Sequence, residues 1–157
     1  MKTYRLIVLD VDGTLVKPKS GATFRKSADD WQWLPGRLER CQELHSQGVK
    51  LALATNQGGV AFGHLDAFEI EQETRIIASA IGAVYAGICF SHPHATIEQY
   101  RRETDARKPG PGMLIAAMAA TGIGPQETLM VGDRGEDEQA AINAGIDFMR
   151  ADSFFAS

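Results

Sequence analysis

The chain has 157 residues, of which 44% are hydrophobic and 23% are charged, and its formal net charge is −4. This length and balance predict a single domain over residues 1–157 with room for a buried core, and they argue against a surface that coats nucleic acid. No stretch approaches the roughly 20 apolar residues of a membrane span, and there are only two cysteines, so we expect a soluble, cytoplasmic protein without a disulfide framework.

Apolar runs alternate with amphipathic ones, which is typical of a parallel sheet covered by helices. The expected strands are residues 4–9, 49–54, 83–90, 128–131 and 146–149. The expected helices are residues 35–48, 65–81, 112–121 and 136–144. A polar segment at 13–33 is expected to form a flap or long loop over the site, and 91–110 a loop rich in Pro and Gly. The predicted fold class is a three-layer α/β domain with a five-stranded, mostly parallel sheet between helices.

The first expected strand stops abruptly at Asp10 and Asp12, which are followed by Gly13 and Thr14. Because unpaired buried charge is costly, both carboxylates are expected at the carboxyl edge of the sheet, where open α/β sheets bind ligands. Side chains alternate along an extended chain, so the two aspartates point the same way. One carboxylate is then placed to attack a phosphorus atom while the other handles a proton. The alternative is a strand that simply runs into an Asp-Gly turn.

Two further segments fit a phosphate site, although each also has a plainer interpretation. Thr55, Asn56 and Gln57 follow the second strand and offer a hydroxyl, amides and, with the next glycines, free backbone N–H groups. Arg107 and Lys108 precede a helix, where the Lys108 ammonium is placed to reach a bound phosphate. Taken alone, the first is an ordinary polar turn and the second a surface lysine in a loop.

The fourth expected strand ends at Asp133, which is expected to emerge beside Asp10. This arrangement suits Mg²⁺, which binds one or two carboxylates together with water and substrate oxygens. Asp137 lies one helical turn further on. We expect Asp137 in a supporting role, either orienting metal-bound water or capping the following helix.

These acidic, hydroxyl and basic clusters, in this order, resemble the haloacid dehalogenase superfamily of aspartyl-nucleophile phosphotransferases. The most specific matches are Asp10-Val11-Asp12-Gly13-Thr14 and Gly132-Asp133. The resemblance implies that Asp10 is the nucleophile and Asp12 the general acid and base. It also implies that Thr55 and Lys108 hold the transferring phosphoryl group.

The same resemblance implies a Mg²⁺ cofactor and a capless architecture. The implied metal ligands are the Asp10 carboxylate, the Asp12 carbonyl and Asp133. The neighbouring residues expected to contact substrate phosphate are Gly13, Asn56, Gln57 and Arg107. The gaps between the motifs are too short for a large cap domain, so we expect an open site of the capless subclass III.

Two capless subfamilies fit the chain. Residues 54–61 and 107–113 resemble the heptose-bisphosphate and histidinol-phosphate phosphatases, whose loop before the lysine holds a structural zinc ion. The corresponding positions here are Cys89, Ser91, Thr104 and Ala106. Three of the four zinc ligands are therefore missing, and no structural zinc is expected. His92 and His94 are interpreted as loop surface rather than as metal ligands.

The second subfamily is the 3′-phosphatase module of polynucleotide kinase phosphatases, which residues 19–24 and the Asp30-Trp31 pair resemble. Both subfamilies usually carry an arginine where Phe62 stands, so this chain departs from each at that position. Trp31 and Trp33 are expected either to anchor the flap to the body or to stack a base.

We therefore expect a Mg²⁺-dependent phosphomonoesterase that works through an aspartyl-phosphate on a small phosphorylated metabolite, such as a sugar phosphate or bisphosphate. A polynucleotide 3′-phosphate is the alternative substrate. A receiver-like phospho-accepting domain is less favoured, because the third strand ends in Cys89-Phe90-Ser91 without an acceptor aspartate. A non-catalytic binding domain is also less favoured, because every catalytic position is filled. The oligomeric state and the role of Phe154 and Phe155 stay open.

Overall fold

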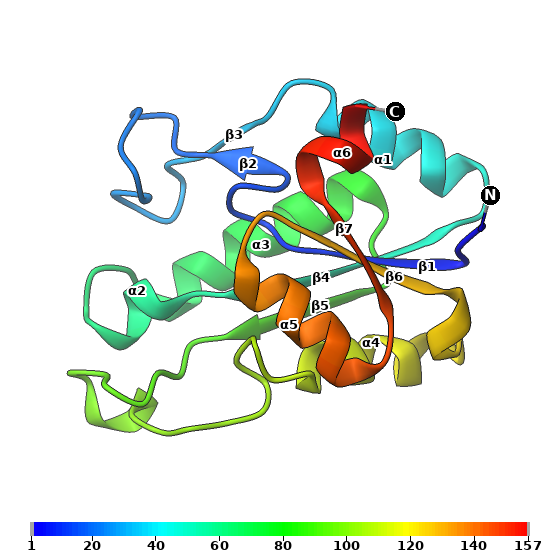
Figure 1. The fold of residues 1–157 in the computed structure, drawn as a ribbon. Coiled ribbons are helices and arrows are strands. Elements are labelled where there is room, and N and C mark those ends of the chain that lie inside the picture. The colour runs from blue at the N-terminus through cyan, green and yellow to red at the C-terminus, as the bar shows by residue number, and fades with distance from the viewer. Residues whose placement is uncertain (1, 157) are drawn as a thin grey trace.

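The computed structural model describes residues 2–156 and shows one parallel sheet flanked by helices (Figure 1). The strands of this sheet are β1 (Leu6–Leu9), β4 (Lys50–Asn56), β5 (Tyr85–Cys89), β6 (Thr128–Gly132) and β7 (Asp147–Arg150). They lie in the order β5-β4-β1-β6-β7, and each neighbouring pair is parallel. The prediction of a five-stranded α/β sheet is confirmed, with every strand parallel.

Alternate residues of the central strand face opposite layers of helices. The helices of the two layers are α1 (Arg37–Ser46), α3 (Ala67–Ile81), α4 (Gly112–Thr121), α5 (Gly135–Ala144) and α6 (Ala151–Ala156). Ile7 and Leu9 join the buried cluster with α1, α3 and α6, whereas Leu6 and Val8 join the one with α4 and α5. Because both faces are covered, all residues of β1 are buried, which explains its continuous apolar run.

The helix ends follow local capping signals in the sequence. Asp66 precedes α3, and its side chain accepts a hydrogen bond from the Glu69 N–H at 3.0 Å. Gly82 ends the same helix in the left-handed conformation, with φ 70°. The predicted helix at 65–81 therefore ends where expected and begins two residues later, at Ala67.

Several short elements lie in segments for which the sequence predicts a loop or assigns no element. The flap contains an antiparallel hairpin of β2 (Val16–Lys17) and β3 (Gln32–Trp33), and α2 (Gly58–Ala61) follows β4. Single 3₁₀ turns lie at Glu98–Tyr100 and Pro125–Glu127. Elements of two to four residues are too short to show a periodic pattern, which is why the sequence analysis did not separate them from loops.

The last helix covers one edge of the core. Phe154 is buried in the same cluster as α1 and α3, and Phe155 packs against that cluster. The Arg37 guanidinium lies 4.4 Å from the centre of the Phe155 ring. These two phenylalanines therefore close a hydrophobic edge of the domain.

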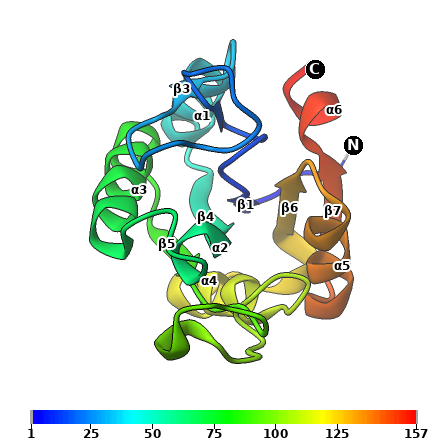
Figure 2. The same cartoon turned by 90° about the vertical axis from the view of Figure 1, so that its left-hand side faces the viewer.

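The carboxyl ends of β1, β4 and β6 meet at one edge of the sheet, and Figure 2 looks toward this edge. The flap lies above these strand ends in that view, and the long loop after β5 lies below them. The segments that carry Asp10, Thr55 and Asp133 are thereby brought together. Within residues 2–156, no helix combines the length and the apolar character needed to cross a membrane.

Candidate active site

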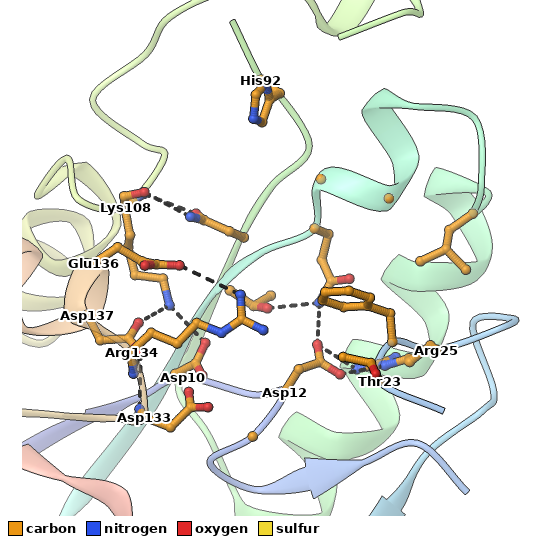
Figure 3. A pocket seen from close by; sticks show the side chains of 18 of the residues that line it. Asp10, Asp12, Thr23, Arg25, His92, Lys108, Asp133, Arg134, Glu136 and Asp137 are labelled. Carbon is orange, nitrogen blue, oxygen red and sulfur yellow. Dashed lines mark hydrogen bonds and ion pairs between the residues drawn. The ribbon is translucent and has the colours of Figure 1, made fainter. Parts of the chain in front are cut away.

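A cavity of about 810 Å³ opens at this edge of the sheet (Figure 3). Its lining includes every residue that the sequence places in a catalytic, phosphate-binding, metal-binding or supporting role: Asp10, Asp12, Gly13, Thr55, Asn56, Gln57, Arg107, Lys108, Asp133 and Asp137. Neighbouring parallel strands end at the same edge, so segments far apart in the sequence converge there. The predicted clustering of these side chains is thus present in the structure.

The Lys108 ammonium lies between two buried carboxylates (Figure 3). Its Nζ donates to Asp10 Oδ1 at 2.9 Å and to Asp137 Oδ1 at 2.6 Å, and its side chain is 2% exposed. Burial opposes the charge, but the two carboxylates outweigh burial and raise the pKa of Lys108. Burial also raises the pKa of Asp10 to about 6, although the Lys108 ammonium lowers it. Near neutral pH, Asp10 is therefore an anion beside a cation, the state that a carboxylate nucleophile needs.

Asp137 binds neighbours within the protein through both of its oxygens. Oδ2 accepts hydrogen bonds from the N–H groups of Asp133 and Arg134, both at 3.1 Å, while Oδ1 accepts from Lys108. Burial and the nearby Asp10 charge raise the pKa of Asp137, with Lys108 partly offsetting them. Asp137 thus ties the first turn of α5 to the lysine, which is the capping arrangement considered for it.

The carboxylates of the site fit a divalent cation. Oxygens of Asp10, Asp133 and Asp137 lie within 4.8 Å of one another. Asp133 Oδ1 is buried and has no hydrogen-bond partner among residues 2–156, a costly state unless a cation or water satisfies it. Gly13 has φ 86°, and a Cβ there would collide with the Asp133 carboxylate. An all-oxygen donor set suits Mg²⁺. Both oxygens of Asp137 accept hydrogen bonds from the protein, and so do both oxygens of Asp10, from Lys108 and from Thr14 Oγ1 at 3.2 Å, so Asp133 offers the free oxygen of this group.

Asp12 lies on the flap side of the cavity and makes a different set of contacts. Its Oδ1 accepts from Arg25 Nε at 2.7 Å, and its Oδ2 accepts from Arg25 Nη2 at 3.2 Å and Gln57 Nε2 at 2.8 Å. The sequence analysis did not place Arg25 in the site, because it lies in an irregular polar segment without a periodicity that would orient it. Gln57 Nε2 also donates to Thr55 Oγ1 at 2.9 Å, so the Gln57 amide links Asp12 to Thr55. The sequence predicts a phosphate contact for Gln57, whereas in the structure its amide binds these two side chains.

Asn56 binds the main chain of Lys108. Its Nδ2 donates to the Lys108 carbonyl at 2.9 Å, and its Oδ1 accepts from the Lys108 N–H at 3.0 Å. The sequence analysis expected Asn56 to contact phosphate; the structure instead shows it as a two-point clamp. The partner lies 52 residues away, so nothing local in the sequence announced this contact. Thr55 is 1% exposed at the base of the cavity.

The loop after β5 contributes Arg107 and His92 to the cavity. Among residues 2–156, no carboxylate forms an ion pair with the Arg107 guanidinium. Burial, and then the positive charge of Arg107, lowers the pKa of His92, which favours the neutral imidazole beside the Arg107 guanidinium. Phe62 packs edge to face against the His92 ring with 5.0 Å between ring centres.

Backbone hydrogen bonds and aromatic packing hold this loop. The His92 N–H donates to the Tyr100 carbonyl at 2.9 Å, and the Ile97 N–H donates to the Ala61 carbonyl at 3.1 Å. Tyr100 packs against Phe90 with 6.1 Å between ring centres. These contacts account for the form of the loop, in which the positions compared with zinc ligands hold Cys89, Ser91, Thr104 and Ala106.

The two tryptophans of the flap pack inward. Trp31 and Trp33 meet edge to face at 5.6 Å and pack against the core, and Trp31 Nε1 donates to Glu73 Oε1 at 3.3 Å. Neither is among the residues that line the cavity, so they anchor the flap to the body. Phe24, by contrast, is 68% exposed and lies in the cavity wall, a placement that the sequence analysis did not predict.

The chain is similar to known phosphatases in both sequence and fold. A family model described as polynucleotide kinase 3 phosphatase matches residues 5–157. A D-glycero-beta-D-manno-heptose-1,7-bisphosphate 7-phosphatase of Photorhabdus laumondii is 38% identical over 145 residues, covering 89% of this chain and 76% of the relative. A protein of the same name from Escherichia coli K12 is 31% identical over 153 residues, covering 92% and 77%. A crystal structure of D,D-heptose 1.7-bisphosphate phosphatase from B. bronchiseptica, complexed with magnesium and phosphate, matches with a TM-score of 0.69 and 32% identity, covering 92% of this chain and 78% of that one.

Proposed function

The chain belongs to the polynucleotide kinase 3 phosphatase family, within the haloacid dehalogenase superfamily of phosphatases, and from that premise we propose that it hydrolyses a small sugar bisphosphate through a phosphorylated Asp10. The observation that carries this proposal is the environment of the Asp10 carboxylate. It contacts the Lys108 ammonium at 2.9 Å, has a pKa raised to about 6, and lines a cavity of about 810 Å³. A carboxylate that is ionised and oriented in this way is suited to nucleophilic attack.

The proposed reaction has two balanced steps. In the first, an Asp10 oxygen forms a bond to phosphorus while the bond from phosphorus to the leaving oxygen breaks. The electron pair stays on the leaving oxygen, and Asp12 gives that oxygen a proton. In the second, a water oxygen attacks phosphorus, Asp12 takes a proton from the water, and the bond to Asp10 breaks. Inorganic phosphate leaves, and both aspartates return to their starting states.

The surrounding residues hold and stabilise the transferring group. Lys108 and Thr55 are proposed to bind its oxygens, with Asn56 fixing the lysine main chain. Asp10 and Asp133 are proposed to hold Mg²⁺ together with the Asp12 carbonyl. When bound, Mg²⁺ would offset the repulsion between the Asp10 carboxylate and the dianionic phosphate.

Two considerations support a sugar bisphosphate as the substrate. The relatives named above act on a heptose bisphosphate. In addition, Arg107 lines the same cavity as Asp10 and has no ion-pair partner within residues 2–156, so its guanidinium is available for a second phosphate.

Phosphate release with Mg²⁺ tests the proposal. The panel holds heptose 1,7-bisphosphate, the matching monophosphate and a 3′-phosphorylated oligonucleotide, with Asp10→Asn as the inactive reference. We expect the bisphosphate to be preferred, and Arg107→Gln to lower kcat/KM for it by about 10-fold or more, since it removes a charge-assisted contact. Arg102→Gln is the matched control, because Arg102 is exposed on the same loop and does not line the cavity. Equal rates for wild type and Asp10→Asn would overturn the proposal.

A polynucleotide 3′-phosphate is the second candidate substrate. It is favoured by the name of the family and by Phe24, an exposed aromatic in the cavity wall where a base could stack. Turnover of the oligonucleotide alone would select this candidate over the sugar bisphosphate, while leaving the chemistry at Asp10 unchanged.

A further inference from the structure

The flap supplies a buried arginine that contacts Asp12 (Figure 3). Arg25 lies between β2 and β3, and its guanidinium meets the Asp12 carboxylate at two points: Nε to Oδ1 at 2.7 Å and Nη2 to Oδ2 at 3.2 Å. Only 3% of the Arg25 side chain is exposed, against 33% of the Asp12 side chain. A two-point contact of this kind fixes the plane of a carboxylate as well as its position.

The guanidinium is also held by the flap, independently of Asp12. Arg25 Nη1 donates to the Ala28 carbonyl at 3.0 Å. Ala28 is itself buried in a cluster with Val60 and Ile70, which belong to the body of the domain. The contact with the Ala28 carbonyl therefore fixes the position of the Arg25 guanidinium, and the guanidinium in turn orients the Asp12 carboxylate.

Asp30 orders the flap around this arginine. Its carboxylate accepts hydrogen bonds from the Ser20 N–H at 2.8 Å, the Ser20 hydroxyl at 2.7 Å and the Lys26 N–H at 2.9 Å. These bonds join the outgoing and returning parts of the flap, and Trp31 anchors it to the core. The flap is thus a fixed frame for Arg25.

The contacts of Asp12 leave a specific acceptor position open. An ionised carboxylate has about four lone-pair sites, two on each oxygen. Arg25 Nη2 and Gln57 Nε2 occupy Oδ2, and Arg25 Nε occupies one site of Oδ1. Among residues 2–156, no other hydrogen bond to this carboxylate is present, so one site on Oδ1 remains.

We propose that Arg25 is the positioning residue of the Asp12 general acid and base, and that it reserves one lone pair of Asp12 Oδ1 for the proton exchanged with the substrate. This inference rests on the proposed function, because it concerns the proton that the leaving oxygen receives. It assigns the flap a place in the reaction: the loop carries no reacting group, but it sets the direction in which Asp12 delivers its proton.

The test compares esters that differ in their need for that proton. Nitrophenolate leaves without protonation, whereas the alkoxide of a sugar or glycerol phosphate does not. Arg25→Gln is expected to lower kcat/KM, which reports the step that releases the leaving group, about 100-fold on the alkyl ester and less than about 5-fold on p-nitrophenyl phosphate. Hydrolysis of the phosphorylated Asp10 follows that step and is common to both esters. In an Asp12→Asn background, Arg25→Gln is expected to cause no further loss, because the two residues act as a unit.

Two control variants separate positioning from folding. Arg37→Gln removes an arginine with similar partners, Asp152 Oδ1 at 3.2 Å and the Ala151 carbonyl at 3.3 Å, outside the cavity, and should leave kcat unchanged. Arg25→Lys keeps the charge without the planar fork and is expected to restore the melting temperature but not kcat/KM on the alkyl ester. Equal losses of kcat/KM on both esters, additive losses in the double variant, or full recovery by lysine would overturn the inference.

A readout without turnover distinguishes the two proposals. The ¹⁵N-detected Arg25 Nε–H resonance, assigned by its loss in Arg25→Gln, is expected to shift in Asp12→Asn. An unmoved resonance would refute the pairing while the phosphatase assays stand. A shifted resonance in an enzyme that releases no phosphate from any ester would instead refute the proposed function, and the positioning role with it.

Discussion

Replacing Asn56 with alanine tests the link between the turn after β4 and Lys108, the proposed phosphate-binding lysine. The Asn56 amide makes two hydrogen bonds to the Lys108 main chain, at 2.9 and 3.0 Å, and the Lys108 residue is 2% exposed. A typical hydrogen bond contributes a net of about 1 kcal/mol, and a buried group left unsatisfied costs about 1–3 kcal/mol. We therefore expect Asn56→Ala to lower the free energy of unfolding by about 2–3 kcal/mol.

The assays for this variant are thermal unfolding and steady-state kinetics. For a chain of this size, the loss corresponds to a melting temperature lower by about 4–12 °C. Release of the clamp also displaces the Lys108 ammonium from Asp10, and a shift of about 1 Å in a catalytic group can cost about 100-fold in rate. We expect kcat/KM to fall by about 10- to 100-fold.

Asn143→Ala is the matched control for this experiment. Asn143 is exposed, and its Nδ2 donates to the carbonyl of the next loop residue, Pro109, at 3.0 Å. Asn143→Ala therefore removes one amide contact to the same loop without removing a contact to Lys108, and it should lower the free energy of unfolding by less than about 0.5 kcal/mol. If Asn56→Ala has the same melting temperature and the same kcat/KM as Asn143→Ala, the Asn56 amide does not hold Lys108 in place.

Three further predictions concern the charges, the metal site and the flap. The pKa of Asp10 is raised from 3.8 to about 6, so the folded state holds the Asp10 proton more tightly than the unfolded state does. The stability that this proton contributes is fully present below about pH 3.8 and is lost as the pH rises through about 6. Asp10→Asn lacks this loss, so in chemical denaturation with EDTA it should be more stable than wild type by about 3 kcal/mol at about pH 7, and this difference should shrink as the pH falls toward about 4; a constant difference would contradict the assignment. Gly13→Ala should destabilise by at least about 2 kcal/mol and weaken Mg²⁺ binding in calorimetry, because its Cβ meets the Asp133 carboxylate; unchanged binding would show that Asp133 is not a ligand. Asp30→Ala should speed limited proteolysis within the flap, whereas Asp29→Ala, at the exposed neighbouring position, should not; equal cleavage rates would show that the Asp30 bonds do not order the flap.

The parts of the fold that sequence reasoning predicted are those with strong local signals. β1 is a continuous apolar run because helices cover both of its faces, and α3 ends at Ile81 because Gly82 follows it in the left-handed conformation. The hairpin of β2 and β3 has strands of two residues, and its pairing depends on contacts across the flap. Such an element has no period to detect.

The candidate site divides in the same way. Asp10 and Asp133 could be singled out from the sequence because each follows a buried strand directly. A charged residue at that position indicates the ligand-binding edge of the sheet, whatever the fold of the remaining chain. The partners of Asn56 and Arg25 were not found, because they depend on which loop faces each side chain after folding. Lys108, for example, meets Asp10 across 98 residues of sequence, and that contact could be expected only from the resemblance to a known family.

Trapping the phosphoryl-enzyme tests the central claim most directly. The enzyme is acid-quenched during turnover of a ³²P-labelled substrate with Mg²⁺, and the labelled peptide is identified. The account predicts a label on the peptide that contains Asp10, released by hydroxylamine as an acyl phosphate is, and absent from Asp10→Asn. Label on a different residue, or turnover by Asp10→Asn at the wild-type rate, would contradict it.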